Sequence, residues 1–300
     1  MESLSSGAHR PRERERAAVI QELRQEFRLS LLLKAAKMAR STFYYYLKRL
    51  SVPDRHTLAK DGIRRIYDLN RGRYGYRRIT IEMKKLGYVI NHKTVLKLMN
   101  QCGIRCMVRM KKYHSYKGEI GKIAPNLLER NFYAQAPNQK WVTDVTEFSL
   151  FGEKLYLSPI MDLFNSEIIS YSISTRPTFE AVLNMAENAF KKIPNDTNLI
   201  LHSDQGWQYQ MNNYQQMLET KGIRQSMSRK GNCLDNAVIE NFFGLLKSEL
   251  LYLQKFDSMD KFVLELKDYI DYYNNVRIKT KLKGLSPIQF RTQSQLILIT

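Results

Sequence analysis

The sequence predicts an α/β domain preceded by all-α helix-turn-helix modules, and two observations carry this prediction. From residue 138 onward, strand-like and helix-like runs follow in the order βββαβαβα, which is typical of an α/β sandwich. Before that point the pattern is helical and strongly basic. Residues 1–125 carry 29 of the 48 Lys and Arg but only 10 of the 29 Asp and Glu. Such a segregated charge predicts a polyanionic partner, most simply nucleic acid.

Length and composition exclude several classes of protein. Three hundred residues with 43% hydrophobic side chains are enough for two or three folded domains. No apolar run approaches the roughly 18 residues of a membrane span, and the Arg-rich start has no apolar segment behind it, so neither a membrane protein nor a secreted one is expected. The three cysteines (Cys102, Cys106 and Cys233) fit a reducing cytoplasm.

Residues 1–52 are expected to form an N-terminal helical region. A polar start, residues 1–16, leads into an amphipathic helix from Ala17, and the segment 29–50 is expected to hold two short helices around a break. Ser41 is a plausible N-cap for the second of these, Thr42 to Arg49. Two helices joined by a small-residue turn suit a helix-turn-helix, although a helical hairpin with packed tyrosines is the alternative. The DNA contacts expected here are Lys48 and Arg49.

Residues 53–115 are expected to form a second helix-turn-helix-like DNA-binding module. Its helices are expected at 58–69, at 76–86 with Gly87 as a left-handed C-cap, and at 92–100 with Asn91 as the N-cap. A basic face of this kind binds phosphates with an affinity that depends on salt. The DNA contacts expected here are Lys93, Lys97, Arg109, Lys111 and Lys112.

A linker, residues 116–137, is expected to separate these modules from a catalytic domain at 138–300. The first three strand-like runs are joined by tight turns and read as an antiparallel meander. The expected strands are 141–148, 154–163, 167–174, 199–201 and 223–226, and the expected helices are 179–192, 212–221 and a long one from Asp235.

Three carboxylates in this domain suit a metal site. Asp204 follows a continuously apolar strand, at the kind of strand end where open α/β sheets bind ligands. Asp144 is placed within the first strand, and Glu240 on the last long helix. Together these acids would repel one another, and bound Mg²⁺ or Mn²⁺ would remove that cost. Two such ions could activate an attacking water or 3′-hydroxyl.

Helix periodicity favours Glu240 over Glu249 as the third carboxylate of the site. At 100° per residue, Glu240 and Lys247 share one face, together with Asn236 and Gly244, whereas Glu249 lies about 180° from Glu240. We therefore expect Lys247 to contact a phosphate beside the metals, with Gly244 leaving room for the DNA backbone. A solvated surface lysine is the alternative for Lys247.

The segment before this helix, Ser228 to Cys233, contains glycine, asparagine and two cations, and is expected to face the substrate. Its expected DNA contacts are Arg229 and Lys230, with Asn236 beyond them. Asp235 is interpreted as an N-cap. His202 and Ser203 could suggest a hydrolase triad, but no nucleophile-elbow context surrounds them.

Several motifs, in order and at the right spacing, resemble the DDE domain of bacterial insertion-sequence transposases. The closest group is the IS-three family, whose core resembles retroviral integrase. The motifs are Trp141-Val142-Thr143-Asp144, His202-Ser203-Asp204-Gln205-Gly206, the segment from Ser228 to Glu240 with Lys247, Tyr273-Asn274 with Arg277, and Ser286-Pro287.

The resemblance implies a ribonuclease-H-like core, a mixed five-stranded sheet with helices on both faces. It also implies that Asp144, Asp204 and Glu240 are the metal-binding catalytic triad and that Lys247 contacts DNA. The activity implied is cleavage and strand transfer at the element's ends without a covalent enzyme–DNA intermediate. The alternatives are a catalytically inactive DNA-binding regulator or remnant, and a metal-dependent nuclease of the same fold.

The resemblance also sets expectations about partners. Family members act as multimers on paired DNA ends, in the cytoplasm at the nucleoid. This chain resembles the product of a second reading frame, whose partner frame supplies a further helix-turn-helix and a leucine zipper. One departure from the family pattern is Lys279, where many relatives carry His or Gln.

Overall fold

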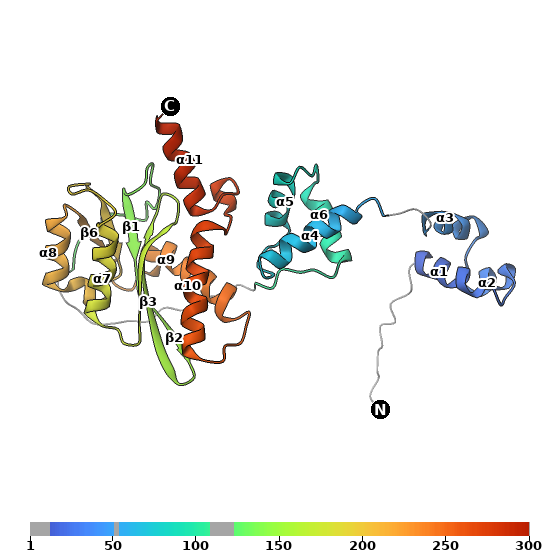
Figure 1. Ribbon diagram of the computed structural model, residues 1–300, viewed down its shortest axis with the longest axis horizontal. Helices are drawn as coiled ribbons and strands as arrows, with labels where there is room; N and C mark the ends of the chain where they lie inside the picture. The colour runs from blue at the N-terminus through green and yellow to red at the C-terminus, as the bar shows by residue number, and fades with distance from the viewer. Residues whose placement is uncertain (1–12, 51–53, 109–122, 300) are drawn as a thin grey trace. The chain divides into compact units, whose positions relative to one another are not determined.

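A computed structural model describes residues 13–50, 54–108 and 123–299 (Figure 1). By its internal contacts the chain divides into two compact units, 1–62 and 63–300. The expected contacts Arg109, Lys111 and Lys112 lie outside the described residues, as do residues 116–122 of the expected 116–137 linker. In the part of the chain that is described, no helix has the length and hydropathy needed to cross a membrane.

The first unit is built from short helices around a small core. Helices α1 (Glu13–Leu23), α2 (Leu29–Ala35) and α3 (Arg40–Leu50) confirm the expected pair of helices around a break. The N-cap expected at Ser41 is wrong, because α3 starts one residue earlier and the Phe43 amide donates to the Ala39 carbonyl at 3.0 Å. The buried side chains of this core are Ala17, Ile20, Leu33, Met38 and Phe43.

The second module has the three helices that the sequence predicts: α4 (Thr57–Leu69), α5 (Tyr76–Lys85) and α6 (His92–Gln101). The Asn91 side chain accepts from the Lys93 amide, which confirms the N-cap of α6. Gly87 follows α5 with φ +86°, a conformation that costs glycine little because it has no Cβ, and this confirms the predicted C-cap.

Residues 123–299 contain one mixed sheet. Strand β3 pairs antiparallel with β1, β2 and β4, while β5 pairs parallel with both β1 and β6. The strands are β1 (Lys140–Thr143), β2 (Thr146–Leu150), β3 (Glu153–Asp162), β4 (Ile168–Ser174), β5 (Ile200–Ser203) and β6 (Arg224–Met227). The antiparallel meander and both later strands are therefore confirmed.

The first strand is interrupted at Asp144 and Val145, so the sheet has six strands rather than five. The expected continuous strand 141–148, with Asp144 inside it, is wrong in this respect. The pairing register is the same on both sides of the break, which puts Asp144 opposite Pro159. Proline has no amide hydrogen for the ladder. The first amide after Asp144, that of Val145, donates to the Asp144 carboxylate at 2.7 Å.

Helices cover both faces of the sheet (Figure 1). One face packs against α7 (Phe179–Phe190) and α8 (Asn212–Thr220), through a core that includes Trp141, Ile160 and Leu201. The other packs against α9 (Ala237–Leu246) and α10 (Met259–Asn275), through a core that includes Val142, Leu157 and Phe242. The remaining elements are α11 (Pro287–Ile299), the 3₁₀ turns Trp207–Gln210, Cys233–Asn236 and Thr280–Leu282, and a π-helical turn at Lys247–Leu251.

Part of the expected linker packs on the edge of this sheet. The Met227 amide of β6 donates to the Pro125 carbonyl at 3.2 Å, and the Leu127 amide donates to the Ser226 hydroxyl at 2.9 Å. Leu128 is buried in the core beneath α9 and α10. These contacts cover the edge strand that would otherwise expose unpaired amides.

Candidate active site

Asp144 lies where β1 stops, at the break in the strand. Its carboxylate is half-buried and accepts from the Val145 amide. Burial raises the pKa of Asp144 well above its ordinary value, and the charges of Asp204 and Glu240 raise it further, against the lowering effect of Lys247. The three acids and the lysine are therefore close enough to influence one another.

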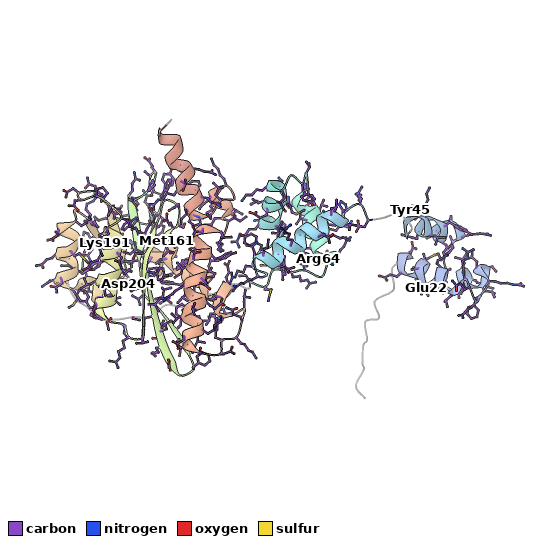
Figure 2. All side chains as sticks on the ribbon, in the orientation of Figure 1. Glu22, Tyr45, Arg64, Met161, Lys191 and Asp204 are labelled. Atoms are coloured by element: carbon purple, nitrogen blue, oxygen red, sulfur yellow. The ribbon has the colours of Figure 1, made fainter. Side chains whose placement is uncertain are left out.

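Asp204 follows β5, as the sequence predicts, and Figure 2 shows its side chain in the sheet-bearing unit. Its Oδ1 accepts from the Gly206 amide at 2.9 Å. A Cβ on Gly206 would stand 2.9 Å from that same oxygen, so a side chain at this position would push the carboxylate aside. Burial raises the pKa of Asp204, although the Gly206 hydrogen bond opposes the shift.

Glu240 and Lys247 lie on α9 and at its junction with the π-helical turn. Burial and the charge of Asp204 both raise the pKa of Glu240. Burial lowers the pKa of Lys247, and its Nζ stands 5.6 Å from the centre of the Phe148 ring. A Cβ on Gly244 would meet open space, as expected if this surface must admit a bulky ligand.

None of the ion pairs among the described residues involves Asp144, Asp204 or Glu240. Within residues 13–50, 54–108 and 123–299, no three His, Cys, Asp or Glu side chains are already arranged to hold a metal ion. Uncompensated like charges oppose a closer approach of these carboxylates, whose hard oxygens suit Mg²⁺ or Mn²⁺. A divalent cation would remove this opposition.

Adding Mg²⁺ is expected to raise the thermal unfolding midpoint of the protein, and more so near pH 8 than near pH 5.5. Because the folded-state pKa values of these three acids are raised, the folded chain holds protons that the unfolded chain has released. Their contribution to stability therefore falls as pH rises from the unfolded-state pKa values through the raised folded-state ones, and the cation offsets that loss. Differential scanning fluorimetry with KCl at matched ionic strength provides the control, and equal shifts at both pH values would contradict this account.

A further acid, Asp235, is buried and fixes the loop in front of α9. Its carboxylate accepts hydrogen bonds from the Arg229 Nε and the Arg130 Nε, each at 2.9 Å, and from the side-chain Nδ2 of Asn126 at 3.0 Å. Hydrogen bonds from Arg229, above all, hold its pKa well below the ordinary range. The N-cap interpretation of Asp235 is wrong, because α9 starts at Ala237 and the cap position is Asn236.

The residues expected to contact DNA differ in their exposure to solvent. Lys93 and Lys97 are exposed on α6, Lys48 is exposed on α3, and Arg229 and Lys230 are exposed in the loop before α9, while the Arg49 side chain lies outside the described residues. Asn236 does not fit its expected role. It is 3% exposed and donates to the Thr143 carbonyl at 3.4 Å, so it braces α9 against β1 rather than offering a surface to DNA.

His202 takes no part in a hydrolase triad. It is fully buried between β5 and β6, with Nδ1 2.8 Å from the Ser226 hydroxyl and Nε2 3.4 Å from the Ser228 hydroxyl. Burial lowers the pKa of His202 to about 4, which keeps the ring neutral. The Ser203 hydroxyl donates to the Asp204 carbonyl, so it is not poised as a nucleophile.

Tyr209 is a site neighbour that the sequence did not reveal. It is fully buried, its hydroxyl lies 3.4 Å from the Thr143 hydroxyl, and burial raises its pKa, with further contributions from Asp204 and Asp144. It therefore lies near enough to two of the acids to be influenced by their charges. No spacing or motif distinguishes it from the other 17 tyrosines of the chain.

Comparison with known proteins matches family models to most of the chain. The HTH-like domain model matches residues 53–112, and two integrase core domain models match residues 134–233 and 240–295. The mixed sheet with helices on both faces and the acids at strand ends therefore define an integrase-core enzyme of the polynucleotidyl transferase class, with a ribonuclease-H-like fold.

Full-length relatives narrow this class. The chain is 55% identical over 276 residues to the putative transposase InsK for insertion sequence element IS150 of Escherichia coli strain K12, covering 92% of this chain and 98% of that protein. It is 32% identical over 281 residues to the transposase InsF for insertion sequence IS3A of the same organism, covering 92% and 98%. The chain belongs to the IS-three family of insertion-sequence DDE transposases, as its motifs indicated. It is a DNA transposase.

Proposed function

We propose that Asp144, Asp204 and Glu240 form the metal-binding catalytic triad of this transposase. The observation that carries the proposal is the placement of three carboxylates at the ends of β1 and β5 and on α9, where each has a raised pKa and Asp204 raises the pKa of both other acids. These acids would hold two Mg²⁺ or Mn²⁺ ions. Such ions would activate the attacking oxygen and stabilise the leaving oxygen of a phosphodiester.

The chain's own residues would orient the DNA around that site. We propose that Lys247, beside Asp144, contacts the phosphate next to the one attacked, while Gly244 leaves space for the backbone. Arg229, held by buried Asp235, and Lys230 would contact DNA in front of α9. Lys93, Lys97 and Lys48 with Arg49 would bind element-end duplex on the two helical modules, and Arg109, Lys111 and Lys112 are proposed from sequence alone.

The reaction we propose is cleavage at the element's ends followed by strand transfer. In the joining step a 3′-hydroxyl oxygen of the element end attacks a phosphorus of the target strand. The new oxygen–phosphorus bond replaces the bond to the target's own 3′-oxygen, which leaves and takes up a proton. One phosphodiester is exchanged for another, so no energy source is needed. We further propose that homo-multimers hold paired ends at the nucleoid, together with any product of a first reading frame.

Strand joining of labelled element-end oligonucleotides into a target duplex tests this proposal. We expect joined products that require Mg²⁺ or Mn²⁺ and disappear on chelation. An element end with a 2′,3′-dideoxy terminus should give no joined product, while cleavage continues. Cleavage without joining from the normal 3′-hydroxyl end would favour the nuclease. Duplex binding without either reaction, with the first-frame product also present, would favour the inactive regulator.

A further inference from the structure

The helix that carries Glu240 and Lys247 does not end as an α-helix. At Lys247 it widens into the π-helical turn Lys247–Leu251, in which the Tyr252 amide donates to the Lys247 carbonyl at 2.9 Å. Single π-turns inside helices are uncommon and concentrate at functional sites. Lys247 is the first residue of this turn, so whatever holds the turn also sets the direction of the lysine.

A buried ion pair holds the turn from one side. Glu249, at its centre, and Arg277, just after α10, are both 1% exposed. The Arg277 guanidinium donates to both Glu249 oxygens, from Nε at 2.7 Å and from a terminal nitrogen at 2.6 Å, and the Tyr269 hydroxyl donates to the same carboxylate at 3.0 Å. A buried carboxylate with this many donors is fixed in position.

The helix-turn-helix-like module holds the turn from the other side. Arg73, between α4 and α5, is 6% exposed and its Nε donates to the backbone carbonyl of Glu249 at 3.0 Å. Carbonyls in the last turn of a helix lack intrahelical partners, and this arginine satisfies one of them. Its guanidinium also lies over the Tyr269 and Tyr272 rings of α10, at 5.4 and 4.9 Å.

Neighbouring contacts extend this interface beyond the single hydrogen bond of Arg73. We call the interface between the α4–α6 module and the segment around Glu249, α10 and residues 276–284 the joint. The Ile278 amide donates to the Tyr74 hydroxyl at 3.0 Å, and the Tyr272 hydroxyl donates to Asn70 at 3.2 Å. A Cβ on Gly284 would stand 2.6 Å from Ile81 of α5, so the two surfaces meet at van der Waals contact.

We propose that Arg73 is a positioning residue for strand transfer: by holding the Glu249 carbonyl, it fixes the π-turn that aims Lys247 at the carboxylate site. The α4–α6 module is then a working part of the catalytic unit as well as a DNA-binding one. This proposal rests on the role proposed above for Lys247, and the triad acids do not depend on it.

The test compares Arg73→Ala with Arg71→Ala in the full chain. Arg71 belongs to the same loop, is 58% exposed and pairs with Glu265, so its loss removes an arginine at the edge of the same joint. For Arg73→Ala we expect amide hydrogen exchange in residues 247–252 to accelerate about tenfold or more, and joining at saturating DNA to slow by a similar factor, because a hydrogen bond to a charged group is lost. Duplex affinity is expected to stay within about twofold, since Arg73 has almost no surface to offer DNA. Arg71→Ala is expected to change neither exchange nor joining.

The conservative variant Arg73→Lys is expected to give intermediate exchange and joining, because an ammonium can still donate to the carbonyl but cannot lie flat on the two tyrosines. It carries the test alone if Arg73→Ala does not accumulate as folded protein. Unchanged exchange at 247–252, or a loss of joining matched by a loss of duplex affinity, would overturn the proposal. If the wild type joins no DNA at all, the proposed function fails, whereas the exchange measurement still reports on the joint.

Discussion

Asp204→Asn is expected to reduce metal-dependent strand joining by roughly three orders of magnitude or more, because bound ions contribute several kcal/mol to such transition states. The amide keeps the size of the side chain and can still accept from the Gly206 amide, so the turn after β5 is preserved. Without metal, the variant is expected to unfold at a higher temperature than the wild type near pH 8, because it relieves repulsion with Asp144 and Glu240.

Asp196→Asn is the matched control for this prediction. Asp196 is exposed before β5, at the opposite end of the strand from Asp204, and its φ of +57° is one that asparagine tolerates. The same change in charge and chemistry there should leave joining and the pH dependence of unfolding as in the wild type. Joining by Asp204→Asn at a rate close to that of Asp196→Asn would remove Asp204 from the triad.

The second large effect is expected on stability. Arg277→Met leaves the Glu249 carboxylate buried without its main partner, which should lower the free energy of unfolding by about 3–5 kcal/mol in urea titrations. Burial alone would raise the pKa of Glu249, but hydrogen bonds and charge from Arg277 outweigh it and leave the pKa lowered. This stabilising contribution is complete above the unfolded-state pKa of about 4.3 and is lost as pH falls through the folded-state pKa.

The double variant Glu249→Leu with Arg277→Met shows whether the loss of stability comes from the unpaired Glu249 charge or from lost packing. Replacing both members of a buried pair by apolar side chains of similar volume often costs little, so most of the stability should return. Arg71→Met, at the exposed pair with Glu265, should change stability only slightly. If the double variant is as unstable as Arg277→Met alone, the effect comes from packing and not from an unpaired charge.

Local pattern predicted most of the helices and strands, because their causes lie within a few residues. Asn91 and Gly87 mark helix ends through their own side-chain and backbone preferences, and both predictions were confirmed. The interruption at Asp144 has its counterpart in Pro159, 15 residues along the chain. That cause becomes visible only once the register of β1 against β3 is known.

Two of the candidate acids stood out in the sequence through a local signature, because Asp204 follows an apolar strand and helix phase separates Glu240 from Glu249. The partners of buried charges have no such signature. Asp235 is held by nearby Arg229 but also by Arg130, 105 residues away. Glu249 is held by Arg277, 28 residues away, so the pairing of Glu249 depends on how α10 packs against the π-turn. Asn236 shares the helix face of Glu240 by helix phase alone, but the approach of β1 encloses it.

The joint around Arg73 bears on where this polypeptide can be divided. A fragment beginning near residue 123 would keep every strand of the sheet and all three acids. It would also uncover the Tyr269 and Tyr272 rings and leave the Glu249 carbonyl and the Ile278 amide without their partners. Insolubility or inactivity of such a fragment would then reflect these exposed rings and unpaired backbone groups, not a defect in the three acids. A truncated chain should therefore begin before α4, so that the α4–α6 module stays together with the sheet.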